Sequence, residues 1–195
     1  MKSLNRTRRT PLYAAVCAAA LLFAFFALSA LTVRAEDEEK KVKLSAADFT
    51  TDAVAAESTA KAIKRDRTYK VRIPSDDVHS FGSGFLSFTA PESGTWVLRL
   101  FGLSAKSDYG CGTVNVLLPS AEDPGRLELR SVRTKGGYAD TLYIATENAP
   151  GAATGSSFRT SRNAWLSLDK GQTIWLYFYF PAKSSVRLRA ELSEE

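Results

Sequence analysis

The side chains that could carry out acid–base or nucleophilic chemistry are scarce in this chain, and the clearest group of them is one short polar segment. His79 is the only histidine, and it stands in the run SDDVHS at residues 75–80. A hydrolytic triad needs an orienting carboxylate, a base and a nucleophile that converge in space, which neighbours in one loop do not do. The run Gly82-Ser83-Gly84 lacks the Gly-x-Ser-x-Gly spacing of a nucleophile elbow. We therefore expect residues 75–80 to form a polar turn and the two glycines to mark a hinge or bulge.

Metal and cofactor chemistry has little support in the residue types. Cys17 and Cys111 are the only cysteines, and with one histidine they cannot form a zinc site without several carboxylates, none of which shows ligand spacing. No basic residue beside Cys111 would activate its thiol, so we expect a small buried side chain there. We predict no catalytic residue, no bound cofactor and no metal. Aspartate and glutamate are plentiful enough that a carboxylate pair of a hydrolase stays open as a third alternative.

One segment, residues 173–180, is apolar on both of its alternating faces. One face carries four aliphatic and phenylalanine side chains, and the other carries Trp175, Tyr177 and Tyr179. A row of such rings can stack on sugars or form the centre of a protein interface, because each ring offers contact area and a polar tip. The alternative is that the helical region 48–67 or the loop 147–163 covers the row. Trp175, Tyr177 and Tyr179 are therefore the candidate partner-binding or sugar-binding residues.

The first 35 residues have the pattern of an export signal. Basic residues open the chain, an apolar run extends from Leu12 to Leu31, and Val33-Arg34-Ala35 supplies the small residues that a signal peptidase requires. We predict cleavage after Ala35 and export to the periplasm of a double-membrane bacterium, with the cell exterior as an alternative. The apolar run is also long enough to remain as an uncleaved anchor through residues 12–33.

The same segment accounts for the excess positive charge of the chain. The whole sequence has 26 lysines and arginines against 21 acidic residues. Residues 1–35 contain five of the basic residues and no acidic ones, so the remaining chain is balanced. Counterion release from nucleic acid needs clustered excess lysine and arginine, and we therefore expect no nucleic-acid partner.

The remaining sequence divides into a charged leader, a helix-forming region and a series of strands. Residues 36–47 predict a solvated spacer, and alanine, glutamate and lysine between 48 and 67 predict one short helix. From residue 68 onward the hydrophobic period is two, and turn residues separate the segments. The predicted strands are 68–73, 84–90, 95–102, 113–118, 126–133, 141–146, 164–168, 173–180 and 185–192. We predict an all-β domain over 68–195, an antiparallel sandwich or jelly roll of about eight or nine strands.

Three stretches together resemble the bacterial pre-peptidase C-terminal type of β-sandwich. The run FLSFTAPESGTWVL at 85–98 is similar to the opening hairpin of that family, and residues 168–178 followed by 185–190 are similar to its closing pair of strands. Thr113 and Asn115, followed by Asp123-Pro124-Gly125, lie where such modules often carry an acidic calcium-binding strand. Because this chain has Thr113 and Asn115 in place of acidic side chains, the resemblance does not extend to calcium. It implies a non-catalytic exported module that docks onto another molecule.

From these observations we expect an exported, non-catalytic β-sandwich that acts as a structural or protein-interaction module of the cell envelope. A carbohydrate-binding module that uses Trp175, Tyr177 and Tyr179 is the alternative. The partner would be an envelope protein or a glycan.

Overall fold

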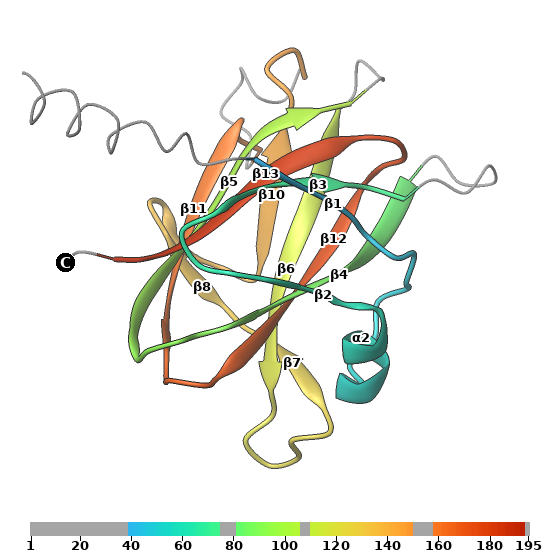
Figure 1. Ribbon diagram of the computed structural model, residues 1–195. Helices are drawn as coiled ribbons and strands as arrows, with labels where there is room; N and C mark the ends of the chain where they lie inside the picture. Colours follow the sequence, from blue (N-terminus) through green and yellow to red (C-terminus); the bar gives the residue numbers. More distant parts are fainter. Residues whose placement is uncertain (1–38, 75–80, 106–109, 150–157, 194–195) are drawn as a thin grey trace, which may run out of the picture. The chain divides into compact units, whose positions relative to one another are not determined.

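Two β-sheets packed face to face make up most of the described chain (Figure 1). The computed structural model describes residues 39–74, 81–105, 110–149 and 158–193, and these ranges contain thirteen strands and one short helix. The predicted sandwich with a short helix near its start is therefore confirmed. In chain order the elements are β1 (Lys40–Lys43), α2 (Ala53–Thr59), β2 (Lys61–Ile63), β3 (Thr68–Arg72), β4 (Phe81–Thr89), β5 (Gly94–Ser104), β6 (Cys111–Pro119), β7 (Leu127–Leu129), β8 (Val132–Thr134), β9 (Gly137–Ala139), β10 (Thr141–Ala145), β11 (Ser161–Leu168), β12 (Thr173–Pro181) and β13 (Ser185–Leu192).

The strands form one sheet of seven and one sheet of six. The seven-stranded sheet has the order β1-β3-β13-β5-β11-β8-β9. The six-stranded sheet has the order β10-β6-β12-β4-β2, with β7 paired to β6. Both sheets are mixed, because β1 pairs with β3 and β2 pairs with β4 in parallel. The prediction of purely antiparallel pairing is wrong for these two pairs, in which the paired strands do not follow one another in the chain.

The main core lies between the two sheets. It forms because the apolar side chains of each strand recur at every second residue and so point to the same side. In β13, Val186 and Leu188 are fully buried, whereas Arg187 and Arg189 alternate with them on the outer side. The inward side chains of β12, such as Phe178 and Phe180, belong to the same core. Burying each large apolar side chain contributes about 1.5–3 kcal/mol, so this core is the principal source of stability.

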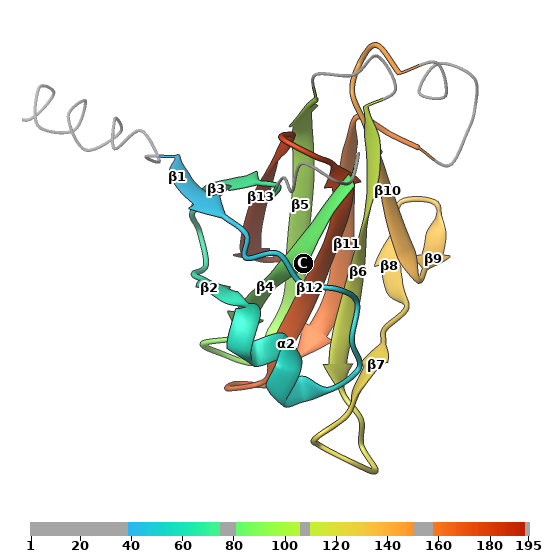
Figure 2. The ribbon, with the colours of Figure 1, turned by 90° about the vertical axis from the view of Figure 1, so that its right-hand side faces the viewer.

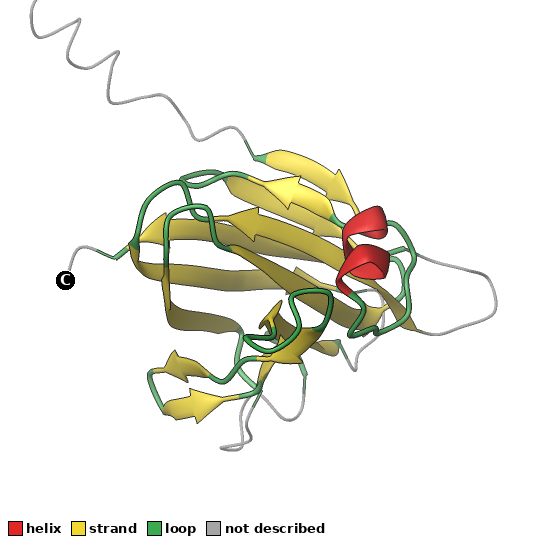
Figure 3. Cartoon of the chain, turned by 90° about the horizontal axis from the view of Figure 1, so that it is seen from below, coloured by secondary structure: helices red, strands yellow, loops and turns green. Residues whose placement is uncertain are grey.

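A second, smaller cluster covers the outer face of the six-stranded sheet. Asp52 is the N-cap of helix α2, and its Oδ1 accepts a hydrogen bond of 2.9 Å from the backbone N–H of Ala55. Ala56 of this helix is fully buried against that sheet. Figures 2 and 3 show α2 lying outside the strands on this side of the sandwich. The predicted helix within 48–67 is thus present, but it is limited to residues 53–59.

The predicted spacer over residues 36–47 is wrong for residues 40–44. Residues 40–43 form β1, and Val42 and Leu44 are buried in the main core. One strand of four residues needs few apolar side chains, because backbone pairing with β3 along the sheet edge supplies most of its contacts. The charged neighbours Lys41 and Lys43 stay exposed on the outer side.

Two local predictions fail because contacts distant in sequence override them. The single strand predicted at 126–133 is divided into β7, in the six-stranded sheet, and β8, in the seven-stranded sheet. The glycines of β4 are neither a hinge nor a bulge, since β4 pairs with β12 without a register shift. A Cβ at Gly82 would lie 2.1 Å from the carbonyl oxygen of Pro74, and one at Gly84 would lie 2.3 Å from that of Ser45. These glycines let the other sheet's chain approach the backbone of β4.

Several predictions concern residues outside the described ranges. They are the export signal at 1–35, the turn that contains His79, and the middle of the loop 147–163. Among the described residues, no helix has both the length and the apolar character needed to cross a bilayer.

Candidate functional site

The structure separates the three aromatic residues predicted on β12. Trp175 and Tyr177 are only 7% and 8% exposed, whereas Tyr179 is 45% exposed. Trp175 and Tyr177 pack with Phe85 and with Ala56 of α2. The sequence suggested two segments that could cover this row of rings. The helical one, α2 with the chain around it, is the one that covers Trp175 and Tyr177.

Burial also sets the chemistry of Tyr177. Removal from solvent raises the pKa of the Tyr177 phenol, although hydrogen bonds with Ser83 and with the backbone of Phe49 oppose this effect. The ring is in edge-to-face contact with Phe49, with centroids 5.2 Å apart. Trp175 Nε1 is buried with no hydrogen-bond partner in the described residues. Trp175 and Tyr177 are therefore packed beneath α2 and its flanking residues and are not available to a ligand.

The exposed end of the row is a smaller aromatic surface. Tyr179 stacks on Phe81, with ring centroids 5.0 Å apart and planes 8° from parallel. Across the strands, Tyr179 is in register with Thr113 on β6 and with Ser83 on β4. Thr113 in turn is in register with Tyr143 on β10. The result is a neutral surface of rings and hydroxyl groups beyond the edge of the cover.

The opposite face of the molecule carries a second tryptophan. Trp165 lies in β11 on the solvent side, because its neighbours Ala164 and Leu166 point into the core. It is in register with Val97 of β5 on one side and Arg133 of β8 on the other, and Arg133 is in register with Tyr138 of β9. Side chains in register point to the same face of a sheet. We call this outer surface of the seven-stranded sheet the Trp165 face.

Trp165 stands where three hollows of this face meet. Their volumes are about 420, 390 and 350 Å³, and Trp165 lines all three. Pockets that hold small ligands have comparable volumes. The guanidinium of Arg133 lies 5.7 Å from the centroid of the Trp165 ring, within the range of a cation–π contact. Tyr138, which also lines one hollow, is 78% exposed.

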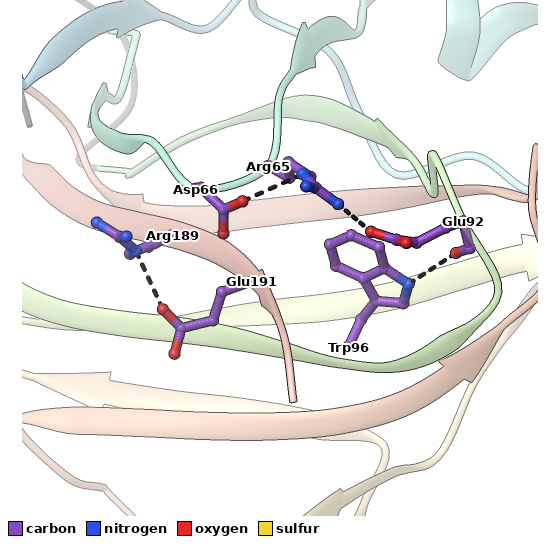
Figure 4. A network of polar contacts seen from close by, with 6 residues as sticks. All are labelled: Arg65, Asp66, Glu92, Trp96, Arg189 and Glu191. Atoms are coloured by element: carbon purple, nitrogen blue, oxygen red, sulfur yellow. Dashed lines mark hydrogen bonds and ion pairs between the residues drawn. The ribbon is translucent and has the colours of Figure 1, made fainter. Parts of the chain in front are cut away.

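Ion pairs hold the charged side chains at the border of the largest of these hollows (Figure 4). Arg189 Nε lies 3.1 Å from Oε2 of Glu191, and Glu191 also pairs with Arg99. Beside them, Arg65 bridges Asp66 and Glu92. The backbone oxygen of Glu92 accepts a hydrogen bond of 3.3 Å from Trp96 Nε1. Exposed pairs of this kind contribute at most about 1 kcal/mol each, so their main effect is to orient the side chains.

Sequence reasoning missed Trp165, although a signal for it was present. In β11 the outward positions are Ser161, Asn163, Trp165 and Ser167. Tryptophan is unusual at an outward position of a strand whose side chains alternate between core and solvent, because its ring adds nothing to the core there. Its partners Arg133 and Tyr138 could not be found in the same way, because short strands from another part of the chain bring them to it.

The other candidate residues have structural surroundings. Cys111 is a free cysteine that is half-buried at the start of β6, where we expected a buried side chain. Asn115 Nδ2 donates to Thr141 Oγ1 at 2.9 Å and to the backbone oxygen of Asp140 at 3.1 Å, which ties β6 to β10. In the described ranges no three histidine, cysteine, aspartate or glutamate side chains lie close enough to hold a metal ion.

Comparison with known proteins adds little to this description. No family model matches the chain, and no curated protein is detectably similar to it in sequence. Among solved structures, it is similar to CorA, a surface-associated copper-binding protein of Methylomicrobium album BG8, with a TM-score of 0.38 and 5% identity over 69% of this chain and 98% of that one. It is also similar to part of a β-glucosidase from Paenibacillus barengoltzii, with a TM-score of 0.29 and 13% identity over 77% of this chain and 13% of that one. At these TM-scores the likeness tells nothing about what this chain binds.

Proposed function

We propose that this protein is an exported, non-catalytic binding module of the cell envelope, and that the Trp165 face is its principal binding surface. Export rests on the charge and hydropathy pattern of residues 1–35. A protein isolated from an envelope fraction whose first residue is Glu36, measured by mass spectrometry, would support this part of the proposal. A cytoplasmic protein that retains Met1 would contradict it.

The position of Trp165 is the observation that carries the proposal. An indole on an interior strand of a sheet, on its solvent side and bordered by three hollows, adds nothing to the core between the sheets. Tryptophan and arginine are the residues most enriched among those that dominate binding energy. Here the two are already in contact, so binding would cost little side-chain entropy.

The groups on this face suit binding better than turnover. They are guanidinium and ammonium groups, aromatic rings, the amide of Asn163, and the carboxylates of Asp66 and Glu191, which are held in ion pairs. A hydrolytic site would need a nucleophile with a base in hydrogen-bonding reach, and the described part of the face pairs no such groups.

Carbohydrate binding through the Tyr179 surface is the second candidate. Its support is the parallel stack of Tyr179 on Phe81 beside the hydroxyl group of Thr113. Neutral sugars bind to this combination, because rings stack on their C–H faces while hydroxyls exchange hydrogen bonds.

Binding of the purified protein to isolated cell envelopes distinguishes the two surfaces. The bound fraction is measured at increasing protein concentration for the unmodified protein, for Tyr138→Ala and Arg133→Ala on the Trp165 face, and for Tyr179→Ala on the opposite sheet. All three side chains are exposed, so the variants should fold. We expect at least a tenfold loss of affinity for the first two and no change for the third. The proposal is wrong if only Tyr179→Ala weakens binding, or if all variants bind like the unmodified protein.

A further inference from the structure

The Trp165 face is basic, although the chain from residue 36 onward is balanced in charge. Pairing register places lysine and arginine in rows across neighbouring strands. Lys41 of β1, Lys70 of β3 and Arg187 of β13 lie side by side, and the row continues to Phe101 of β5. The outward basic side chains of this sheet are Lys41, Lys43, Lys70, Arg72, Arg99, Arg133, Arg187 and Arg189, and the acidic ones on or beside it are Glu39, Asp66, Glu92, Asp140 and Glu191.

The few acidic groups compensate only part of this charge. Glu39 pairs with Arg187, and Glu191 pairs with Arg99 and Arg189. In the described ranges, no ion pair is found for Lys41, Lys70 or Arg72. One side of the face, over β1 and β3, therefore carries uncompensated positive charge, and charge complementarity requires an anionic occupant.

Arg187 is held in a defined place within the row. Gly102 of β5 has a φ of +60°, and a Cβ there would lie 2.7 Å from an Nη atom of Arg187. The absence of a side chain at Gly102 thus lets the guanidinium lie across the strand. There it pairs with Glu39, so in the described ranges Lys41 and Lys70 are the cations of this row that have no ion pair.

The spacing of the cations and the rings beside them fit a linear sugar polymer. Neighbouring strands lie about 4.8 Å apart, so Lys41, Lys70 and Arg187, on three adjacent strands, place cations at about that spacing along one row. A polymer with one carboxylate on each sugar offers charges at a similar repeat. In the row that contains Trp165, Arg133 would meet a carboxylate while the exposed ring of Tyr138 stacks on a sugar. Asn163 and Ser161, in the adjacent rows, can hydrogen-bond to hydroxyls.

A protein partner fits this surface less well. Lysine is depleted at the centres of protein interfaces, and this face carries lysine together with few large aliphatic side chains. We propose that the Trp165 face binds an acidic polysaccharide that bears one carboxylate per sugar. This inference rests on the proposed function, because it assigns a ligand class to the same surface.

Titration with polygalacturonate oligomers tests the inference, and the fully methyl-esterified oligomers of equal length are the matched neutral ligand. We expect the acid form to bind and the ester not to bind. If four charges are neutralised, affinity for a flexible polyanion falls about 50-fold between about 50 mM and about 200 mM salt. Trp165 reports binding through its fluorescence, since Trp96 is fully buried and Trp175 is nearly so.

A pair of double variants localises the effect. Lys41→Gln with Lys70→Gln should reduce affinity for the acid form about tenfold or more at low salt. Lys61→Gln with Lys170→Gln removes the same charge from exposed positions outside this face, and it should leave the affinity unchanged.

Besides a failure of polygalacturonate to bind, three outcomes would overturn the inference. They are equal binding of the ester, equal loss in both double variants, and tighter binding of polyglutamate or single-stranded DNA of equal charge, which would indicate an acidic protein or a nucleic acid instead. If polygalacturonate does not bind while Tyr138→Ala still reduces binding to envelopes, the ligand class is wrong and the binding surface stands. If neither effect is seen, the proposed function fails as well.

Discussion

Replacing Gly112 by alanine measures how closely the two sheets are packed. Gly112 lies on the inner side of β6, and a Cβ there would lie 2.2 Å from Cδ1 and 2.4 Å from Cγ of Phe180. Ordinary van der Waals contact begins near 3.4 Å, so the ring or the strand would have to move by about 1.2 Å. Phe180 is fully buried in the core, and Gly112 is paired with Ile144 of β10. Neither group can move without disturbing its neighbours.

Two opposing terms set the expected magnitude. Overpacking a core costs about 1–3 kcal/mol, and contact with the centre of a buried ring belongs at the upper end of this range. Alanine also removes the excess backbone entropy of glycine in the unfolded chain, which stabilises by about 0.4–1 kcal/mol. The steric term is larger, and we expect Gly112→Ala to lower the free energy of unfolding by about 2 kcal/mol.

Urea unfolding followed by circular dichroism provides the assay. Gly136→Ala is the matched control, because a Cβ there meets nothing within 4 Å, and it should change stability by less than about 0.5 kcal/mol. Phe180→Ala removes Cγ, Cδ1 and Cε1, the atoms that the new Cβ would meet. In that background Gly112→Ala should cost less than about 0.5 kcal/mol, so the two substitutions should be strongly non-additive. An equal cost of Gly112→Ala in both backgrounds would refute the proposed clash.

Three further predictions concern the cover on the six-stranded sheet. Asp52→Ala removes the N-cap of α2 and should cost about 1 kcal/mol in thermal or urea unfolding, whereas Asp52→Asn should cost less than half of that. Trp175→Phe should cost less than Trp96→Phe in urea unfolding, because Trp175 Nε1 is buried without a partner and Trp96 Nε1 has one; the reverse order would contradict this account. Because burial raises the pKa of Tyr177 above its ordinary value of 10.0, this residue's contribution to stability is constant below about pH 10 and declines above it, where the unfolded chain ionises first. Urea unfolding between pH 7 and pH 11 should show a weaker decline for Tyr177→Phe, and an unchanged slope would show that Tyr177 is not responsible.

The strands that sequence alone could predict are those with a core on one side and solvent on the other. In β13, apolar Val186 and Leu188 alternate with arginines, and the predicted range 185–192 agrees with the observed strand. The segment 126–133 shows why a longer alternation can mislead. Leu127 and Leu129 occupy odd positions and Val132 an even one, so the phase changes where the chain leaves one sheet for the other. Leu127 is buried in the cover and Val132 in the main core.

Short edge strands were beyond sequence reasoning for a different reason. β1 contains three lysines and one valine, a composition typical of a solvated segment. It becomes a strand because β3 offers an unpaired edge, and that edge depends on how β13 pairs with β3. Such contacts connect residues far apart in the chain, and no local pattern contains them.

The balanced charge of the sequence from residue 36 onward illustrates the same limit for the candidate site. A net count argues against an anionic partner only if charges are mixed over the surface, because binding depends on the local potential. In a sheet the period of two sends alternate residues to opposite faces, and pairing register then decides which charges become neighbours. Lys41, Lys70 and Arg187 come from three strands that span most of the sequence, and register alone brings them into one row. Near neutrality overall therefore does not exclude an acidic ligand, and the rows of the seven-stranded sheet are where such a ligand should be sought.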